Sequence, residues 1–167
     1  FTVLEIVGHQ ISCRAENAGT LMDAKGLSMS RVNLRKEFLS TRNLDLVRFA
    51  IESGVDFIGL SFVETPDDVQ AVKDMVGRKG PRLVSKIETQ GALDNLMEIS
   101  ELSDALMIDR GDLSAEVDLE SIAFLQKHIL AEARRVSLPV IIATEFLHSM
   151  IHAPLPTKAE VSDISNS

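Results

Sequence analysis

Hydrophobic and polar positions follow two alternating patterns along most of this chain. From residue 40 onward, short apolar runs alternate with longer segments in which apolar residues recur every three or four positions. Continuous apolar runs of this length are typical of buried strands, and the longer period is typical of helices. The predicted strands cover residues 56–61, 83–87, 105–108 and 140–143. The predicted helices cover residues 43–53, a segment opening at Thr65, 92–100, 121–135 and a short segment near 147–151.

The segment that opens at Thr65 carries the clearest helix-start signal. Thr65 is a favourable N-cap, Pro66 fits the first turn, and Asp67 and Asp68 suit the positive end of the helix dipole. Gly54 is a plausible stop for the helix predicted before it. These local signals place helix ends independently of the apolar pattern.

Strands buried on both faces, each followed by a helix, indicate parallel βαβ units. Doubly wound sheets and (β/α) barrels both contain such units, so the pattern alone leaves both open. The chain has 167 residues, fewer than the roughly 250 of a typical complete eight-stranded barrel. An α/β class with about four βα units is therefore expected.

The first 28 residues differ from the rest. Residues 2–7 and 10–15 are β-rich and flank Gly8 and His9, which predicts a hairpin. Gly19 and the pair Lys25-Gly26 punctuate the segment after this hairpin. We expect residues 1–28 to be the end of a small β domain with its linker, and residues 29–167 to be the α/β domain.

Composition narrows the possible partners. The formal net charge of −8 argues against nucleic acid or an anionic membrane as a partner. Cys13 is the single cysteine, so no intrachain disulfide is possible and a reducing, cytoplasmic compartment is expected. No apolar run approaches the ~18 residues needed to cross a bilayer.

Polar residues gather where the predicted strands end, which is the ligand-binding edge of parallel α/β folds. Lys86 and Glu88 share one side of their strand by alternation. Asp112 follows the next strand, after Gly111, which allows close approach of a ligand to the backbone. Carboxylates from neighbouring strands suit Mg²⁺ or Mn²⁺. Three structural alternatives stay open: a strand-end ion pair, a simple turn with an Asp cap, and a structural Thr144.

Several ordered blocks resemble the pyruvate kinase family over essentially the whole chain. They include Glu16-Asn17-Ala18-Gly19 with Lys25-Gly26, residues 55–62, Ser85-Lys86-Ile87-Glu88, Arg110-Gly111-Asp112-Leu113, Ala143-Thr144, Ser149-Met150-Ile151 and residues 156–163. The resemblance implies a partial (β/α)8 TIM-type barrel with a short N-terminal β segment from the lid domain. It also implies that the first two and the last barrel strands lie outside this chain, as in an excerpt of a longer protein.

The resemblance further implies an enzyme that converts phosphoenolpyruvate and ADP to pyruvate and ATP in glycolysis. By this resemblance Lys86 and Thr144 are catalytic, and Glu88 and Asp112 hold Mg²⁺ or Mn²⁺. Arg110, Gly111, Asp112 and Thr144 would bind the small-molecule substrate. The family's K⁺ ligands would lie outside this chain. A half barrel exposes two sheet edges, so we also expect a homo-oligomer or pairing with the missing parts.

Departures from the family pattern keep other functions open. Asp109 stands where a small residue is usual, Glu145 replaces a glutamine, and Glu64 stands where a basic residue is common. These changes make the expected substrate mouth more negative. They favour two alternatives: a metal-dependent lyase, aldolase or decarboxylase that uses a pyruvate enolate, or a binding module with reduced catalysis.

Overall fold

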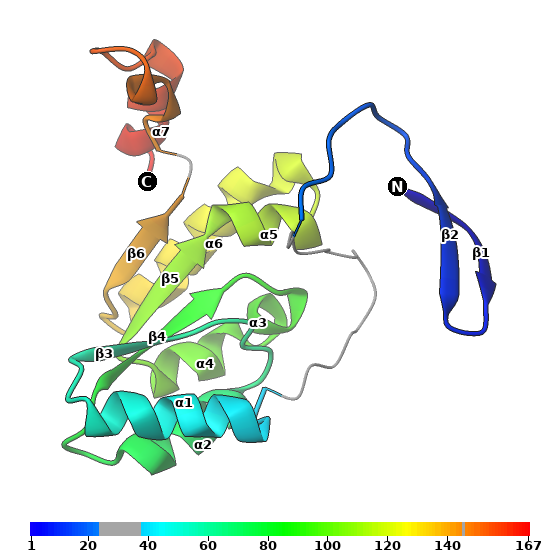
Figure 1. Cartoon of the computed structure of the whole chain (residues 1–167). Helices are drawn as coiled ribbons and strands as arrows, with labels where there is room; N and C mark the ends of the chain where they lie inside the picture. The colour runs from blue at the N-terminus through cyan, green and yellow to red at the C-terminus, as the bar shows by residue number, and fades with distance from the viewer. Residues whose placement is uncertain (24–37, 145) are drawn as a thin grey trace.

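The computed structural model describes residues 1–23, 38–144 and 146–167. Two antiparallel strands come first, and a four-stranded parallel sheet with its helices follows (Figure 1). The strands are β1 (Thr2–Val7), β2 (Gln10–Arg14), β3 (Phe57–Leu60), β4 (Arg82–Ile87), β5 (Ala105–Asp109) and β6 (Val140–Ala143). The helices are α1 (Thr41–Glu52), α2 (Pro66–Val76), α3 (Gln90–Asp94), α4 (Leu96–Leu102), α5 (Arg110–Glu116), α6 (Ile122–Arg135), α7 (Lys158–Ser165), and the 3₁₀ turns η1 (Leu119–Ser121) and η2 (His148–Ile151).

The sheet has the order β3-β4-β5-β6, so each strand pairs in parallel with the next along the chain. Its register places Lys86 opposite Met107, and Met107 opposite Ile141, on one face. Ile87, Ile108 and Ile142 form the next row, on the other face. The predicted parallel α/β class is confirmed.

Helices α1, α2, α4 and α6 form one layer on a single face of this sheet. Helix α1 contacts α2, α2 contacts α4, and α4 contacts α6, so the helices run in the same order as the strands (Figure 1). A doubly wound sheet would divide its helices between both faces, whereas a barrel keeps them all outside. The arrangement is that of a barrel wall, and the described strands do not close into a barrel.

The hydrophobic core lies between this helix layer and the sheet. Its fully buried members come from alternate strand positions and from the inner stripes of the helices. They include Val69, Val72, Leu83, Ile87, Ile99, Leu106, Ile108, Leu113 and Ile129. Burying each such side chain contributes roughly 1.5–3 kcal/mol.

The opposite face of the sheet is less covered than predicted. The expectation that every strand is buried on both faces holds for β4 and much of β5, and it is wrong for β3 and β6. Phe57 is 56% exposed and Ile141 is 45% exposed on that face. Both strands are edges of the sheet that the structure describes, and an edge strand has a neighbour on one side only.

Helix ends follow the local signals closely. Thr65 caps α2, as its sequence predicts, and Asp68 completes a reciprocal capping box with it. Gly54 follows α1 with a φ of 67°, the left-handed conformation that favours glycine after a helix. A second capping box, Thr157 with Glu160, opens α7.

Three features differ from the predicted elements. The helix expected over 92–100 is two helices, α3 and α4, divided at Asn95, whose amide donates hydrogen bonds to the carbonyls of Glu64 and Gly91. The short segment near 147–151 is a 3₁₀ turn. Helices α5 and α7 were not predicted, because their few apolar residues give no helical stripe.

The N-terminal hairpin is confirmed by the antiparallel pairing of β1 with β2, with Gly8 at φ 59° in the turn. Every residue from 1 to 23 is exposed. The pair Lys25-Gly26 and the predicted domain boundary after residue 28 lie outside the described residues. No helix in the part of the chain that the structure describes is long and apolar enough to span a bilayer.

Candidate functional site

Four charged side chains meet at the carboxyl ends of β4 and β5; we call Lys86, Glu88, Asp109 and Asp112 the cation cluster. Parallel pairing brings these strand ends to one edge of the sheet. Lys86 Nζ lies 2.9 Å from Glu88 Oε2, 3.0 Å from Asp109 Oδ2 and 4.0 Å from Asp112 Oδ2. One ammonium among three carboxylates leaves a formal charge of −2.

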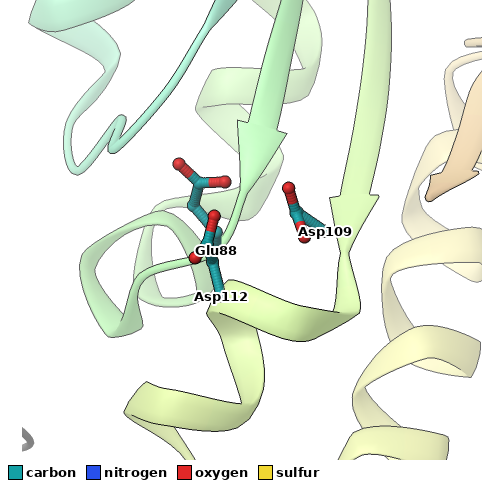
Figure 2. Close-up of side chains that lie close together, drawn as sticks. All are labelled: Glu88, Asp109 and Asp112. Atoms are coloured by element: carbon teal, nitrogen blue, oxygen red, sulfur yellow. The ribbon is translucent and has the colours of Figure 1, made fainter. Parts of the chain in front are cut away.

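The three carboxylates face a common point (Figure 2). Glu88, Asp109 and Asp112 each offer an oxygen, and these oxygens lie within 4.8 Å of one another. Carboxylate oxygens are the ligands that Mg²⁺ and Mn²⁺ prefer. The predicted metal residues Glu88 and Asp112 are therefore brought together, and Asp109 joins them.

Glu88 is held from the neighbouring strand. It is fully buried, and its Oε1 accepts a hydrogen bond of 2.7 Å from the backbone N–H of Phe62. The residue that makes this contact, Phe62, has a φ of 56°, which is uncommon for a bulky residue. Glu88 Oε2 makes no hydrogen bond of acceptable angle among the described residues, although Lys86 Nζ is 2.9 Å away. We take the pair as ionic, because opposite charges attract at this distance whatever the hydrogen-bond angle.

Lys86 remains protonated in this setting. Burial of the side chain disfavours the charged form and lowers its pKa. The close ionic contacts with Glu88 and Asp109 act in the other direction and outweigh it, so the pKa lies above the ordinary lysine value. Lys86 also donates a hydrogen bond of 3.3 Å to Ser61 Oγ at the end of β3. It is a fixed positive charge at neutral pH.

Thr144 completes the predicted group from the end of β6. Its hydroxyl accepts a hydrogen bond of 3.1 Å from the Gly111 N–H and lies 3.5 Å from Asp109 Oδ1. A Cβ on residue 111 would lie 3.6 Å from both oxygens, so glycine keeps the space between them open. Thr144 has a φ of 68°, which for a β-branched residue costs on the order of 1–3 kcal/mol. Strain of this kind clusters at functional sites.

Arg110 points away from the cation cluster, into a second group that we call the Arg110 clamp: Arg110, Thr144, Phe146 and Asp163. Its Nη1 donates to both Asp163 oxygens at 2.8 and 2.9 Å, and its Nη2 donates to the Thr144 carbonyl at 3.0 Å. The guanidinium lies 4.1 Å from the centre of the Phe146 ring. The side chain of Arg110 thus ties α5 to α7, and only its backbone is left for the predicted substrate contact.

Asp109 is one residue that the sequence leaves without a fixed role. A carboxylate at this strand end is expected either to repel an anionic substrate or to recruit a cation, and the structure places it beside Glu88 and Asp112. Asp163 lies in a block that resembles the family and has no predicted role; the structure pairs it with Arg110. Glu145, a predicted contributor of negative charge, lies outside the described residues.

Comparison with known proteins identifies the family of this chain. The family model "Pyruvate kinase, barrel domain" matches residues 1–167. The chain is 38% identical over 164 residues to a pyruvate kinase of Mycobacterium tuberculosis, covering 97% of this chain and 35% of that protein.

Two other pyruvate kinases are similarly close. That of Thermococcus litoralis is 38% identical over 167 residues, covering 99% of this chain and 35% of the relative. That of Clostridium perfringens is 35% identical over 170 residues, covering all of this chain and 36% of the relative. The chain thus spans about a third of the length of the relatives it matches, and it belongs to the pyruvate kinase family.

Proposed function

We propose that the protein containing this chain transfers a phosphoryl group from phosphoenolpyruvate to ADP and so forms pyruvate and ATP. The observation that carries the proposal is the cation cluster: a protonated lysine within 4.0 Å of three carboxylates at the ligand-binding edge of a barrel wall. Membership of the pyruvate kinase family supports the same reaction.

The residues present fit a divalent cation. Oxygens of Glu88, Asp109 and Asp112 lie close together, and Glu88 Oε2 is buried without a well-angled hydrogen bond. We assign Glu88 and Asp112 to the metal in the proposed enzyme. When bound, Mg²⁺ or Mn²⁺ would neutralise negative charge on the substrate oxygens. By the family resemblance, the ligands of a K⁺ ion would lie outside this chain.

Lys86 would stabilise the charge that develops during transfer. The bond between phosphorus and the enol oxygen breaks, a bond to a terminal oxygen of ADP forms, and the enolate carbon then takes a proton. A fixed ammonium beside the enol and phosphoryl oxygens lowers the energy of this charge separation. Because its raised pKa keeps Lys86 charged, this lysine would stabilise negative charge electrostatically, and other groups would transfer the proton.

Thr144 and the backbone before α5 would orient the substrate. The Gly111 N–H donates to the Thr144 hydroxyl at 3.1 Å, so both groups lie at one place, and a substrate carboxylate would replace this hydrogen bond. Thr144 would also assist the proton step at the methylene carbon. The amides of Arg110 and Gly111 complete the proposed substrate contacts.

The test is ATP formation by the full-length protein from phosphoenolpyruvate and ADP with Mg²⁺ and K⁺. We expect Lys86→Met to lower kcat by on the order of 10²–10³-fold, as for the loss of one stabilising group. Lys79→Met is the matched control, because Lys79 is exposed and lies between α2 and β4, at the opposite edge of the sheet. Absence of ATP formation by the unmodified protein would overturn the proposal.

One observation favours a second candidate, a metal-dependent lyase or decarboxylase that uses a pyruvate enolate. Asp109 lies 3.0 Å from Lys86 Nζ and offsets the charge that a phosphoryl group would need. A pyruvate enolate carries less negative charge than a phosphoryl group in transfer, and an enzyme that uses only the enolate needs no nucleotide site. Turnover of oxaloacetate without nucleotide, in the same protein preparation, would favour this candidate over phosphoryl transfer.

A further inference from the structure

The cation cluster holds one carboxylate more than the pair assigned to the metal above. Asp109 ends β5, and its side chain is mostly buried, at 13% exposed. One of its oxygens lies 3.0 Å from Lys86 Nζ and the other 3.5 Å from Thr144 Oγ1. A carboxylate in this position adds a third negative charge beside a single lysine.

A structural explanation for Asp109 would be a helix cap, and the structure excludes it. Asp109 occupies the N-cap position of α5, where a carboxylate usually accepts a backbone N–H from the first turn. Its side chain makes no such hydrogen bond. The N–H of Gly111 is bonded to Thr144 instead. The carboxylate of Asp109 is therefore directed at the cluster and not at its own helix.

A second observation concerns the charge balance inside the cluster. Glu88 is fully buried, and its Oε2 has no hydrogen bond of acceptable angle in the part of the chain described. Burying a carboxylate oxygen is costly unless a cation compensates it, and Lys86 Nζ, 2.9 Å away, supplies that cation here. A single ammonium must serve Glu88, Asp109 and Asp112 at once.

We propose that Asp109 is a third carboxylate of the divalent-cation site and raises the affinity of the protein for Mg²⁺ or Mn²⁺. This inference rests on the proposed function, from which the identity of the cation is taken. With Asp109, the cluster has a formal charge of −2, which a divalent ion cancels. Without Asp109, the same ion leaves the loaded site at +1. Since affinity for a hard cation rises with the number of charged oxygen ligands, the third carboxylate strengthens binding.

The experiment measures Mn²⁺ binding by calorimetry in the full-length protein with no substrate present. We expect Asp109→Asn to weaken Mn²⁺ binding by roughly tenfold, in the range seen when a group supporting a metal site is lost. Asp56→Asn is the matched control: it removes the same charge from an exposed residue at the opposite end of the sheet, before β3. The control should keep the affinity of the unmodified protein within twofold.

Asp109→Ala serves as a second variant, with circular dichroism of both variants to verify folding. Weaker Mn²⁺ binding in both Asp109 variants, with the control unchanged, supports the third carboxylate. Unchanged or tighter binding in Asp109→Asn, or no Mn²⁺ binding by the unmodified protein, overturns it. The proposed reaction is tested separately, since Mn²⁺ could bind as expected in a protein that forms no ATP.

Discussion

The cation cluster and the Arg110 clamp are neighbours at the same edge of the sheet, yet their charges are arranged in opposite ways. In the Arg110 clamp one guanidinium meets one carboxylate through two hydrogen bonds, and it also contacts a carbonyl and an aromatic ring. Its Nε is buried without a hydrogen bond among the described residues. In the cation cluster one ammonium serves three carboxylates. Matched charge is what a structural link requires, whereas excess charge of one sign points to a ligand that the protein has to bind.

The clamp should therefore matter for stability and the cluster for binding. Both groups contain a charged side chain that is more than four-fifths buried, Arg110 and Lys86. Burial alone does not separate them. Their difference lies in the number of partners, and that difference can be tested group by group.

The largest expected effect is on the clamp. Arg110→Met should lower the free energy of unfolding by about 3 kcal/mol, because it leaves Asp163 and the Thr144 carbonyl without their charged partner. The measurement is urea denaturation of the full-length protein. Arg78→Met is a suitable control, since Arg78 is exposed in the turn after α2. An Arg110→Met protein as stable as the unmodified one would remove the distinction between the two regions.

Binding of Mn²⁺ to the cation cluster should have a somewhat smaller effect on the free energy of unfolding. Mn²⁺ at 100 times its dissociation constant should stabilise the folded protein by about 2.7 kcal/mol, provided that it binds only the folded state. The shift in thermal midpoint measures this gain. It should be lost in Glu88→Gln and kept in Arg110→Met, because only the first variant removes a proposed ligand. Equal stabilisation of both variants would place the ion elsewhere.

The smallest expected effect concerns Glu160, in the first turn of the helix α7 that carries Asp163 of the clamp. Glu160 accepts hydrogen bonds from the hydroxyl and N–H of Ser149 and from Thr157, and these hold its pKa down at about 2. A lowered pKa means that the carboxylate stabilises the fold fully above its ordinary value near 4.5, and that this contribution is lost as the pH falls toward about 2.

Glu160→Gln should accordingly be less stable than the unmodified protein at pH 7, and the gap should narrow on acidification below about pH 4.5. Thermal midpoints measured from pH 7 to pH 3 would show it. The isosteric change preserves size, removes the charge and replaces one acceptor oxygen with an NH2 donor. A gap that stays constant over this range would mean that Glu160 contributes through packing and not through its carboxylate.

Much of the fold could be predicted from particular residues. Thr65, Pro66 and Asp68 placed the start of α2, and the apolar runs placed all four parallel strands to within one or two residues. Helices α5 and α7 could not be predicted from apolar periodicity, because hydrogen bonds and ion pairs hold them in place. Such contacts produce no regular spacing of apolar residues in the sequence. The division between α3 and α4 at Asn95 could not be predicted, because it depends on a hydrogen bond to the carbonyl of Glu64, 31 residues away.

The sequence by itself determined the α/β class and the family, and it placed Lys86, Glu88, Asp112 and Thr144 at strand ends, because apolar periodicity and strand-end polarity are local properties. Only the tertiary structure decided that the helices share one face and that Arg110 turns toward Asp163. It also decided that Asp109 joins Glu88 and Asp112 around Lys86. Those outcomes depend on the direction of side chains from strands that are distant in sequence, and pairing of the strands sets that direction.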